Sequence, residues 1–176
     1  MRRLVRLVLD RHLDPKYSHI SENVNLRSEY SSLLRDVPED IEFASLALDK
    51  AADAINLWIG NHRSTTSLHK DHYENIYVQI RGRKHFVLLP PIEMPCVNEQ
   101  SLTWARYTPI DISTTRTSPE LTINVSKHDE CLPVATWDPD QPEIRVTPYS
   151  HLSRPHRVTL DEGDMLYLPA MCVNQV

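Results

Sequence analysis

Residues 66–75 read TSLHKDHYEN, and this stretch decides how the rest of the chain is interpreted. It contains a histidine and an aspartate two positions apart, His69 and Asp71. Because side chains i and i+2 of a β-strand point to the same face, this spacing can present an imidazole and a carboxylate to one cavity. A second imidazole would complete the 2-His-1-carboxylate set that suits Fe(II). On its own the pair is weak evidence, since most pairs with this spacing lie on protein surfaces.

The alternation of residue types continues beyond this stretch. The odd positions are polar or amphipathic and carry Ser67, His69, Asp71, Tyr73, Asn75, Tyr77 and Gln79, whereas Leu68, Ile76, Val78 and Ile80 are apolar even positions. Tyrosine at alternate positions is too large and too apolar to serve solubility alone. We therefore expect the odd face to line a polar cavity inside a small barrel.

Lys84 follows at the start of the next apolar segment. Residues 76–80 and 85–89 read as two strands of a hairpin, joined by a turn at 81–83 that contains Gly82. This placement would let the Lys84 ammonium reach the cavity and hold a carboxylate of an anionic co-substrate. The alternative is a solvated lysine at the end of a strand, beside Arg81 and Arg83.

Composition sets the remaining bounds. A chain of 176 residues with 40% hydrophobic and 24% charged residues is typical of one globular domain. The net charge of −5 makes nucleic acid an unexpected partner. No apolar run approaches the ~18 residues of a membrane span, so no membrane partner is expected. Three cysteines without C-x-x-C spacing favour a reducing compartment, and we expect a cytoplasmic or nuclear protein.

The fold class expected from the sequence is all-β with short N-terminal helices. Gly is scarce (3) and Pro abundant (13), which favours short strands joined by stiff loops. Helices are expected within 29–35 and 43–52, and strands at 55–59, 76–80, 85–89, 121–125, 157–160 and 165–168. The segment 133–148 is expected to be an ordered surface loop, because Trp137 and the adjoining Tyr149 give it side chains to bury. Many short strands in one domain indicate a sandwich or a barrel.

These motifs together resemble the JmjC family of Fe(II)- and 2-oxoglutarate-dependent oxygenases, and most of all its small lysyl hydroxylases. The resemblance rests on Thr66, His69, Asp71, Asn75 and Lys84, and on the sequence GDMLYLPA at 163–170. It implies a double-stranded β-helix, a cupin-like jelly roll. We expect a single domain over 1–176, with an N-terminal support region at 1–53 and the β-helix core at 54–176.

The resemblance also implies a chemistry. His69 and Asp71 would bind iron, Thr66 and Lys84 would bind the distal carboxylate of 2-oxoglutarate, and Asn75 would assist near its metal-bound end. The implied cofactors are Fe(II), 2-oxoglutarate and O₂. The implied partner is a protein substrate with a reactive lysine side chain, such as a GTP-binding protein. Family members can dimerise through C-terminal elements that this sequence does not contain.

The sequence departs from the family near its end. The family places a histidine, the third iron ligand, at the position of Asn174, and aromatic residues where this chain has Cys172 and Val173. The family then continues through strands that close the barrel, so we expect a jelly roll that is incomplete at its C-terminus. Because a neutral amide is a poorer ligand for Fe(II) than an imidazole, we expect a truncated and impaired oxygenase.

Two alternatives stay open at this point. One is a catalytically inactive JmjC-like binding module, and the other is a cupin that uses another metal without being an oxygenase. No other histidine is an evident substitute for the missing ligand. His72 has the wrong strand phase for the odd face, and His85 is out of phase with Lys84.

Overall fold

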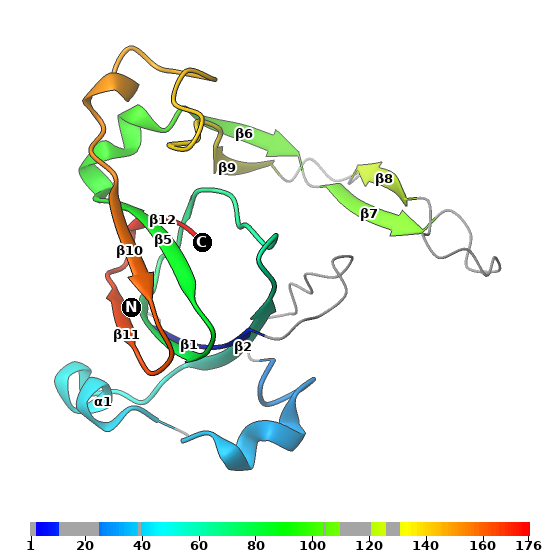
Figure 1. The fold of residues 1–176 in the computed structure, drawn as a ribbon, viewed down its shortest axis with the longest axis vertical. Coiled ribbons are helices and arrows are strands. Elements are labelled where there is room, and N and C mark those ends of the chain that lie inside the picture. Colours follow the sequence, from blue (N-terminus) through cyan, green and yellow to red (C-terminus); the bar gives the residue numbers. More distant parts are fainter. Residues whose placement is uncertain (1–2, 11–24, 39, 104, 110–120, 126–130) are drawn as a thin grey trace.

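The structure, a computed structural model, describes residues 3–10, 25–38, 40–103, 105–109, 121–125 and 131–176. Two four-stranded sheets face each other and enclose the interior of a small barrel (Figure 1). Sheet A has the strand order β11 (Met165–Leu168), β4 (Glu74–Arg81), β1 (Arg3–Asp10), β2 (Ala54–Gly60). Sheet B has the order β10 (His156–Leu160), β5 (Lys84–Leu89), β12 (Val173–Gln175), β3 (His69–Lys70). The expected all-β, cupin-like jelly roll is confirmed.

The remaining elements lie outside these two sheets. A narrow two-stranded ribbon extends away from the barrel, as Figure 1 shows. It pairs β6 (Glu99–Thr103) with β9 (Cys131–Ala135), and β7 (Ala105–Pro109) with β8 (Leu121–Val125). The helices are short: η1 (Ser31–Asp36), α1 (Glu42–Leu48), η2 (Pro91–Cys96) and η3 (Ser150–Leu152). Within the described ranges, no helix has the length and apolar character needed to cross a bilayer.

Sheet A takes one of its inner strands from the first ten residues. β1 runs parallel to both of its neighbours, with Leu4 opposite Ala54 of β2 and opposite Asn75 of β4. The edges of β2 and β4 that face each other are therefore paired along their length. The region 1–53 was expected to be a support region with short helices. It contributes this strand to the sheet as well as η1 and α1.

The interior of the barrel is filled where the two sheets meet. Tyr77 of β4 and Phe86 of β5 are almost fully buried, and their rings pack edge to face with centroids 4.7 Å apart. Leu160 and Leu168 belong to the same buried cluster. Because Tyr77 comes from sheet A and Phe86 from sheet B, this contact holds the two sheets together.

The predicted hairpin of β4 and β5 is wrong, although both strands exist. β4 pairs with β1 and β11, whereas β5 pairs with β10 and β12 in the other sheet. The turn at Gly82, which has φ of 76°, carries the chain from one sheet to the other. The physical reason is that each strand already has two hydrogen-bonded neighbours in its own sheet.

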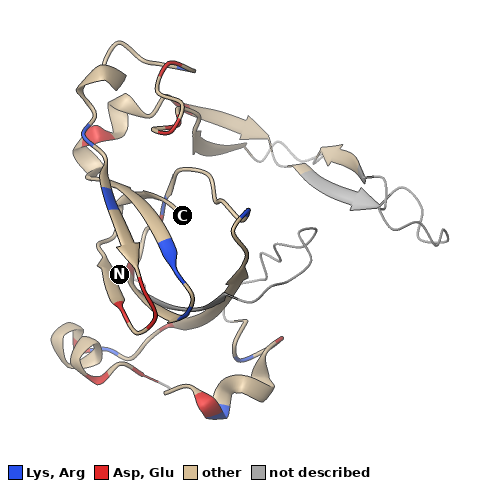
Figure 2. Ribbon diagram, viewed as in Figure 1, with Lys and Arg blue, Asp and Glu red and all other residues tan. Residues whose placement is uncertain are grey.

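The outer faces of both sheets are covered by the chain itself. Trp137 is buried against the outer face of sheet B, beside Val87, Leu89 and Val173. The prediction for Trp137 is confirmed, but that for Tyr149 is wrong, because Tyr149 is 54% exposed. In Figure 2, acidic and basic residues both occur on the barrel, around the N-terminal helices and in the loops at the top of the view.

Asn25 attaches the N-terminal helices to the free edge of β2. Its side-chain amide donates to the carbonyl of Leu57 (2.9 Å), and its Oδ1 accepts from the Leu57 backbone N–H (2.7 Å). This pair of bonds imitates the pairing of another strand and satisfies backbone groups at the sheet edge. The same layer buries Leu26 against Ile55 and Leu57.

Tyr167 provides a test of how β11 is held to β4. Its hydroxyl donates to Oε2 of Glu74 (2.5 Å), and this bond is the main cause of a raised Tyr167 pKa. Tyr167→Phe should lower the free energy of unfolding by about 1 kcal/mol at neutral pH, because a hydrogen bond to a carboxylate is lost. Urea unfolding followed by fluorescence measures this change.

The pH dependence and a matched control make this prediction specific. A folded-state pKa above the unfolded one stabilises the protein below the ordinary tyrosine pKa of about 10 and stops doing so as pH rises through the raised value. The difference between wild type and Tyr167→Phe should therefore shrink at alkaline pH. Tyr149→Phe is the control, since Tyr149 is equally exposed and its hydroxyl has no hydrogen bond to any described residue. Equal losses in the two variants would contradict the assignment.

Candidate functional site

The structure brings His69 and Asp71 together. Nε2 of His69 lies 4.0 Å from Oδ2 of Asp71, and both side chains are partly exposed. Nδ1 of His69 is 2.7 Å from the backbone carbonyl of Ser67. Because a carbonyl only accepts, Nδ1 is the donor in this contact, and Nε2, the nitrogen nearer Asp71, is the one that a neutral ring can offer to a metal ion. In most metal-binding histidines, the ring nitrogen that does not bind the metal donates a hydrogen bond of this kind, and this bond fixes the orientation of the ring.

The local backbone differs from the single long strand that the alternation predicted. β3 comprises only His69 and Lys70 in sheet B, and β4 begins at Glu74 in sheet A. The chain crosses between the sheets at 71–73, so Asp71 lies just after a strand and not within one. The carbonyl of Asp71 accepts from the N–H of Met171 (2.7 Å), which holds this crossing in place.

Asn75 lies on the interior face at the start of β4 and is almost completely buried. Its Nδ2 donates to Oδ2 of Asp71 and to the carbonyl of Tyr73, both at 3.4 Å. These contacts orient the Asp71 carboxylate. Oδ1 of Asn75 is buried without a hydrogen-bond partner. The odd face of β4 therefore is an interior polar face, as predicted, with Tyr77 and Gln79 also buried on it.

Asn174 stands directly across from His69. In the antiparallel pairing of β12 with β3, Asn174 is opposite His69, and in the pairing with β5 it is opposite Leu88. Directly opposed residues share one face of a sheet with Cβ atoms ~5 Å apart. Nδ2 of Asn174 donates to the carbonyls of His69 (3.4 Å) and Cys172 (3.3 Å), and Oδ1 is buried without a partner. The position expected to hold a third ligand therefore lies beside the imidazole.

Lys84 begins β5 on the same interior face as Phe86 and Leu88. It lies about 13 Å along the strand from Leu88, the residue opposite Asn174. A Cβ atom placed on Gly60 would lie 3.6 Å from Nζ of Lys84, so the ammonium reaches across the interior to β2 in sheet A. Sequence reasoning missed Gly60, where an added Cβ would be crowded by Ser64, 3.1 Å from its Cβ, and would meet the ammonium at an ordinary contact distance.

Among the described residues, the hydrogen bonds of Thr66 go to Val176 and not to Lys84. Its N–H donates to the carbonyl of Val176 (2.7 Å), and its hydroxyl accepts from the Val176 N–H (3.0 Å). These bonds add one rung beyond the pairing of β3 with β12. Thr66 therefore fixes the end of β12, the strand that carries Asn174.

No described group of three or more histidine, cysteine, aspartate or glutamate side chains converges on one point. His85 lies on the outer side of β5, where Nδ1 contacts the hydroxyl of Thr159 (2.9 Å). His72 is exposed. Neither histidine joins His69 and Asp71, in keeping with the strand phase read from the sequence.

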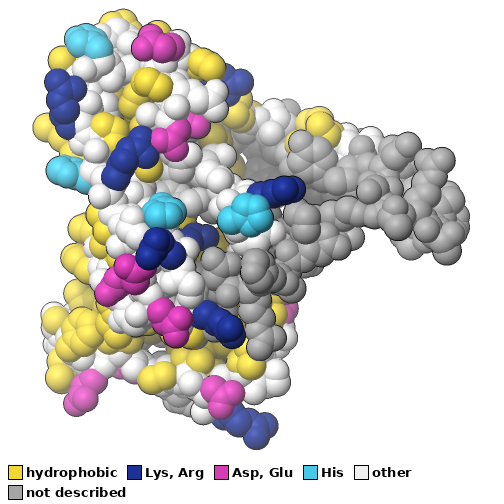
Figure 3. Space-filling view, in the orientation of Figure 1, with side chains coloured by type: hydrophobic (Ala, Val, Ile, Leu, Met, Phe, Trp, Pro, Cys, Tyr) yellow, Lys and Arg dark blue, Asp and Glu magenta, His cyan; other side chains and the backbone are white. Residues whose placement is uncertain are grey.

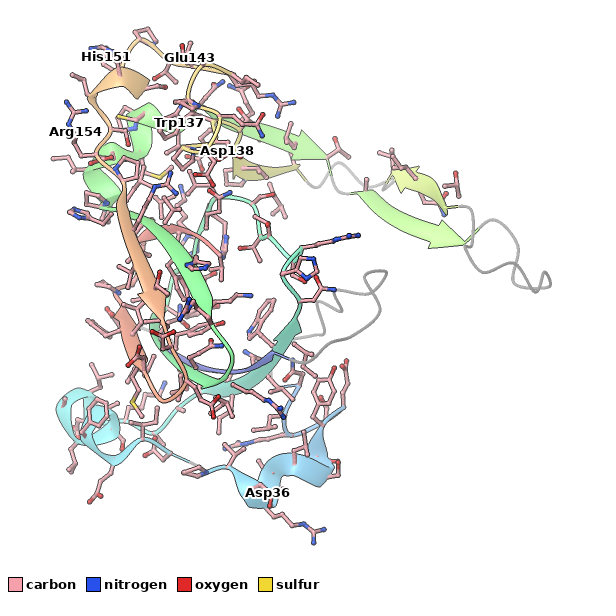
Figure 4. The ribbon with its side chains drawn as sticks, in the orientation of Figure 1. Asp36, Trp137, Asp138, Glu143, His151 and Arg154 are labelled. Carbon is pink, nitrogen blue, oxygen red and sulfur yellow. The ribbon has the colours of Figure 1, made fainter. Side chains whose placement is uncertain are left out.

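A separate cavity of about 490 Å³ lies on the other side of sheet B. It is lined by residues 65–68, by Gln175 and by the loop that carries Trp137 and Asp138, and Figure 4 places these last two at the root of the ribbon. Gln175 is opposite Val87 and faces the outer cluster, whereas Asn174 faces the interior. The cavity is thus distinct from the site around His69.

In Figure 3, histidine and basic side chains surround the middle of the face in view.

Comparison with known proteins identifies a family and several relatives of this chain. Residues 1–176 match the family described as "Cupin-like domain". The chain is 37% identical over 152 residues to the human bifunctional peptidase and (3S)-lysyl hydroxylase JMJD7, covering 86% of this chain and 46% of that protein. It is 34% identical over 162 residues to the lysine-specific demethylase JMJ32 of Arabidopsis thaliana, covering 88% and 46%. The chain spans about half the length of these curated relatives.

The tautomer of His69 is directly testable. We expect ¹⁵N-detected NMR to show that the neutral ring of His69 carries its proton on Nδ1, because Nδ1 donates to the Ser67 carbonyl. Adding Zn²⁺ should shift the Nε2 resonance of His69 and leave that of His85 in place. A neutral His69 ring with its proton on Nε2, or equal shifts in both rings on metal addition, would contradict this geometry.

Proposed function

The chain belongs to the JmjC group of the cupin-like domain family, and on this basis we propose that it is an Fe(II)- and 2-oxoglutarate-dependent oxygenase domain that acts on a lysine side chain of a protein. The observation that supports the proposal is that one jelly roll brings His69 and Asp71 together and also places the Lys84 ammonium near Gly60, further along its interior. When bound, the iron and its co-substrate would supply the oxidising chemistry. The protein would supply placement and exclusion of water.

The residues at the site fit a divalent metal ion. The 4.0 Å between Nε2 of His69 and Oδ2 of Asp71 is less than the sum of two metal–ligand bonds of about 2.1 Å each. An imidazole and a carboxylate suit Fe(II) when further positions stay open. Asn75 would hold the Asp71 carboxylate in orientation through its Nδ2. We propose that His69 and Asp71 bind the metal.

Lys84 supports the assignment of a dicarboxylate co-substrate. Its ammonium lies in the interior near Gly60. Lys84 is four residues along β5 from Leu88, which is opposite Asn174, and Asn174 is in turn opposite His69. A dicarboxylate could then bind the metal at one end and meet the ammonium at the other. We propose that Thr66 binds the same carboxylate of the co-substrate as Lys84. In this structure the Thr66 hydroxyl accepts a hydrogen bond from the backbone of Val176.

The substrate class is proposed from the relatives. The names of two of them specify lysine, one as a lysyl hydroxylase and one as a lysine-specific demethylase. Both activities act on a lysine side chain of a protein, and this shared chemistry is what we carry to the present chain. A GTP-binding protein is one substrate of this kind.

Asn174 favours one alternative function, a binding module without turnover. An amide oxygen is a weaker ligand for Fe(II) than an imidazole, so the domain could hold the co-substrate without activating O₂ at a useful rate. The two functions differ in a measurable product, since only turnover yields succinate from 2-oxoglutarate.

Two substitutions separate metal binding from co-substrate binding. Asp71→Ala should abolish Fe(II) binding, because only the His69 imidazole and a neutral amide would remain. Lys84→Ala should weaken 2-oxoglutarate about tenfold to a hundredfold and leave metal affinity unchanged, because it removes one charge-assisted contact. Anaerobic titration with Fe(II) and then 2-oxoglutarate, followed by the charge-transfer absorbance of their complex, measures both affinities.

The control and the turnover assay complete this test. Lys50→Ala removes an ammonium that pairs with Asp53 on the surface and should change neither affinity. Admitting O₂ should then yield succinate from the wild type above the level of Asp71→Ala. A 2-oxoglutarate complex without succinate would establish the binding module instead, and equal effects of Asp71→Ala and Lys84→Ala would contradict the separate roles.

A further inference from the structure

The side-chain oxygen of Asn174 is a buried acceptor at this site. The residue is 2% exposed, and its Oδ1 has no hydrogen-bond partner. Leaving a buried acceptor unsatisfied costs about 1–3 kcal/mol. The orientation of the amide is fixed by its other end, since Nδ2 lies near the carbonyls of His69 and Cys172, which can only accept. Oδ1 must therefore point away from both carbonyls.

The surroundings of this oxygen favour a cation. Asn174 shares the interior face with His69, whose Nε2 lies 4.0 Å from Oδ2 of the Asp71 carboxylate. Asn75, which contacts that carboxylate, presents a second buried amide oxygen without a partner. The carboxylate and the two unsatisfied amide oxygens are all acceptors, and a neutral imidazole nitrogen beside them can also bind a metal ion. Only a metal ion, or a ligand rich in donors, would satisfy such a set.

We propose that Asn174 is the third metal ligand, through Oδ1, and that it shifts the selectivity of the site towards harder divalent cations. The inference rests on the proposed metal site at His69 and Asp71 and extends it. The donor set becomes one imidazole nitrogen and two oxygens, in place of two nitrogens and one oxygen. Imidazole suits Fe, Zn and Cu, whereas carboxylate and carbonyl oxygens suit Mn and Mg. The preference of this site for Zn²⁺ over Mn²⁺ should therefore be smaller than that of a site with two histidines and one carboxylate.

Metal titrations of the purified 176-residue chain test this assignment. Mn²⁺ binding is measured from the free-ion EPR signal, and Zn²⁺ binding by competition with Mn²⁺. Asn174→Leu should weaken Mn²⁺ at least tenfold, since loss of a ligand costs more than loss of a residue that merely orients one. Asn174→His should raise the affinity for Zn²⁺ relative to Mn²⁺ by about tenfold or more, because a nitrogen donor replaces an oxygen.

A charged variant gives a readout that does not depend on Asn174→Leu being folded. Asn174→Asp buries a carboxylate, so its melting temperature without metal should fall below that of wild type. Saturating Mn²⁺ should then raise the melting temperature of Asn174→Asp more than that of wild type, because binding to the folded state alone stabilises it. The increase should vanish when Asp71→Ala is added.

Gln79 is the matched control for both variants. It is also a fully buried interior amide whose oxygen has no partner, but it lies further along β4, with its Nε2 bonded to the carbonyl of Arg81. Gln79→Leu should leave Mn²⁺ affinity unchanged. Gln79→Glu should lower the melting temperature without a corresponding rescue by Mn²⁺.

The possible outcomes separate this inference from the function on which it rests. If Asn174→Leu binds Mn²⁺ within twofold of wild type while Asp71→Ala does not bind it, Asn174 is not a ligand and the metal site stands. Rescue of Asn174→Asp no greater than that of Gln79→Glu would overturn the inference in the same way. Absence of Mn²⁺ and Zn²⁺ binding in the wild-type chain would overturn both the inference and the proposed metal site.

Discussion

The insertion of β12 between β3 and β5 is the constraint on which the whole site depends. β3 comprises two residues, and β12 is the only described strand with which it pairs. This pairing puts Asn174 opposite His69 and simultaneously opposite Leu88 of β5. The three side chains therefore form one row on the interior face. Thr66 extends the pairing by a further rung through Val176, so the register cannot slip by one residue without losing these bonds.

The interior of the barrel combines a packed half with a polar half. The edge-to-face contact of Tyr77 with Phe86 joins the sheets, while unsatisfied amide oxygens of Asn75 and Asn174 lie near the metal-binding pair. Each unsatisfied oxygen costs about 1–3 kcal/mol, a large share of the net stability of a small domain. Such costs concentrate where a ligand can relieve them, so the polar half is suited to binding and the packed half to holding its shape.

The sequence predicts the faces of the strands better than their partners. Alternation correctly places Asn75 and Tyr77 in the interior, because side-chain direction depends only on local pleating. It misses the crossing between sheets at 71–73, since three residues without a glycine or proline carry no turn signal. It also misses β12, because residues 173–175 are too few to show any period. The pairing of Asn25 with β2 depends on residues about thirty positions apart and leaves no local pattern.

The difference between an absent ligand and a changed ligand is visible only in three dimensions. In the sequence, Asn174 reads as the loss of a histidine, which argues for an inactive domain. In the structure its Nδ2 is held by the carbonyls of His69 and Cys172, so the oxygen is directed by the backbone and not left to rotate. An apolar residue could pack beside Leu88 at this position without leaving an acceptor unsatisfied. Packing alone therefore disfavours an amide here, because its oxygen is buried without a partner. Coordination of a hard divalent cation by that oxygen would offset this loss of free energy.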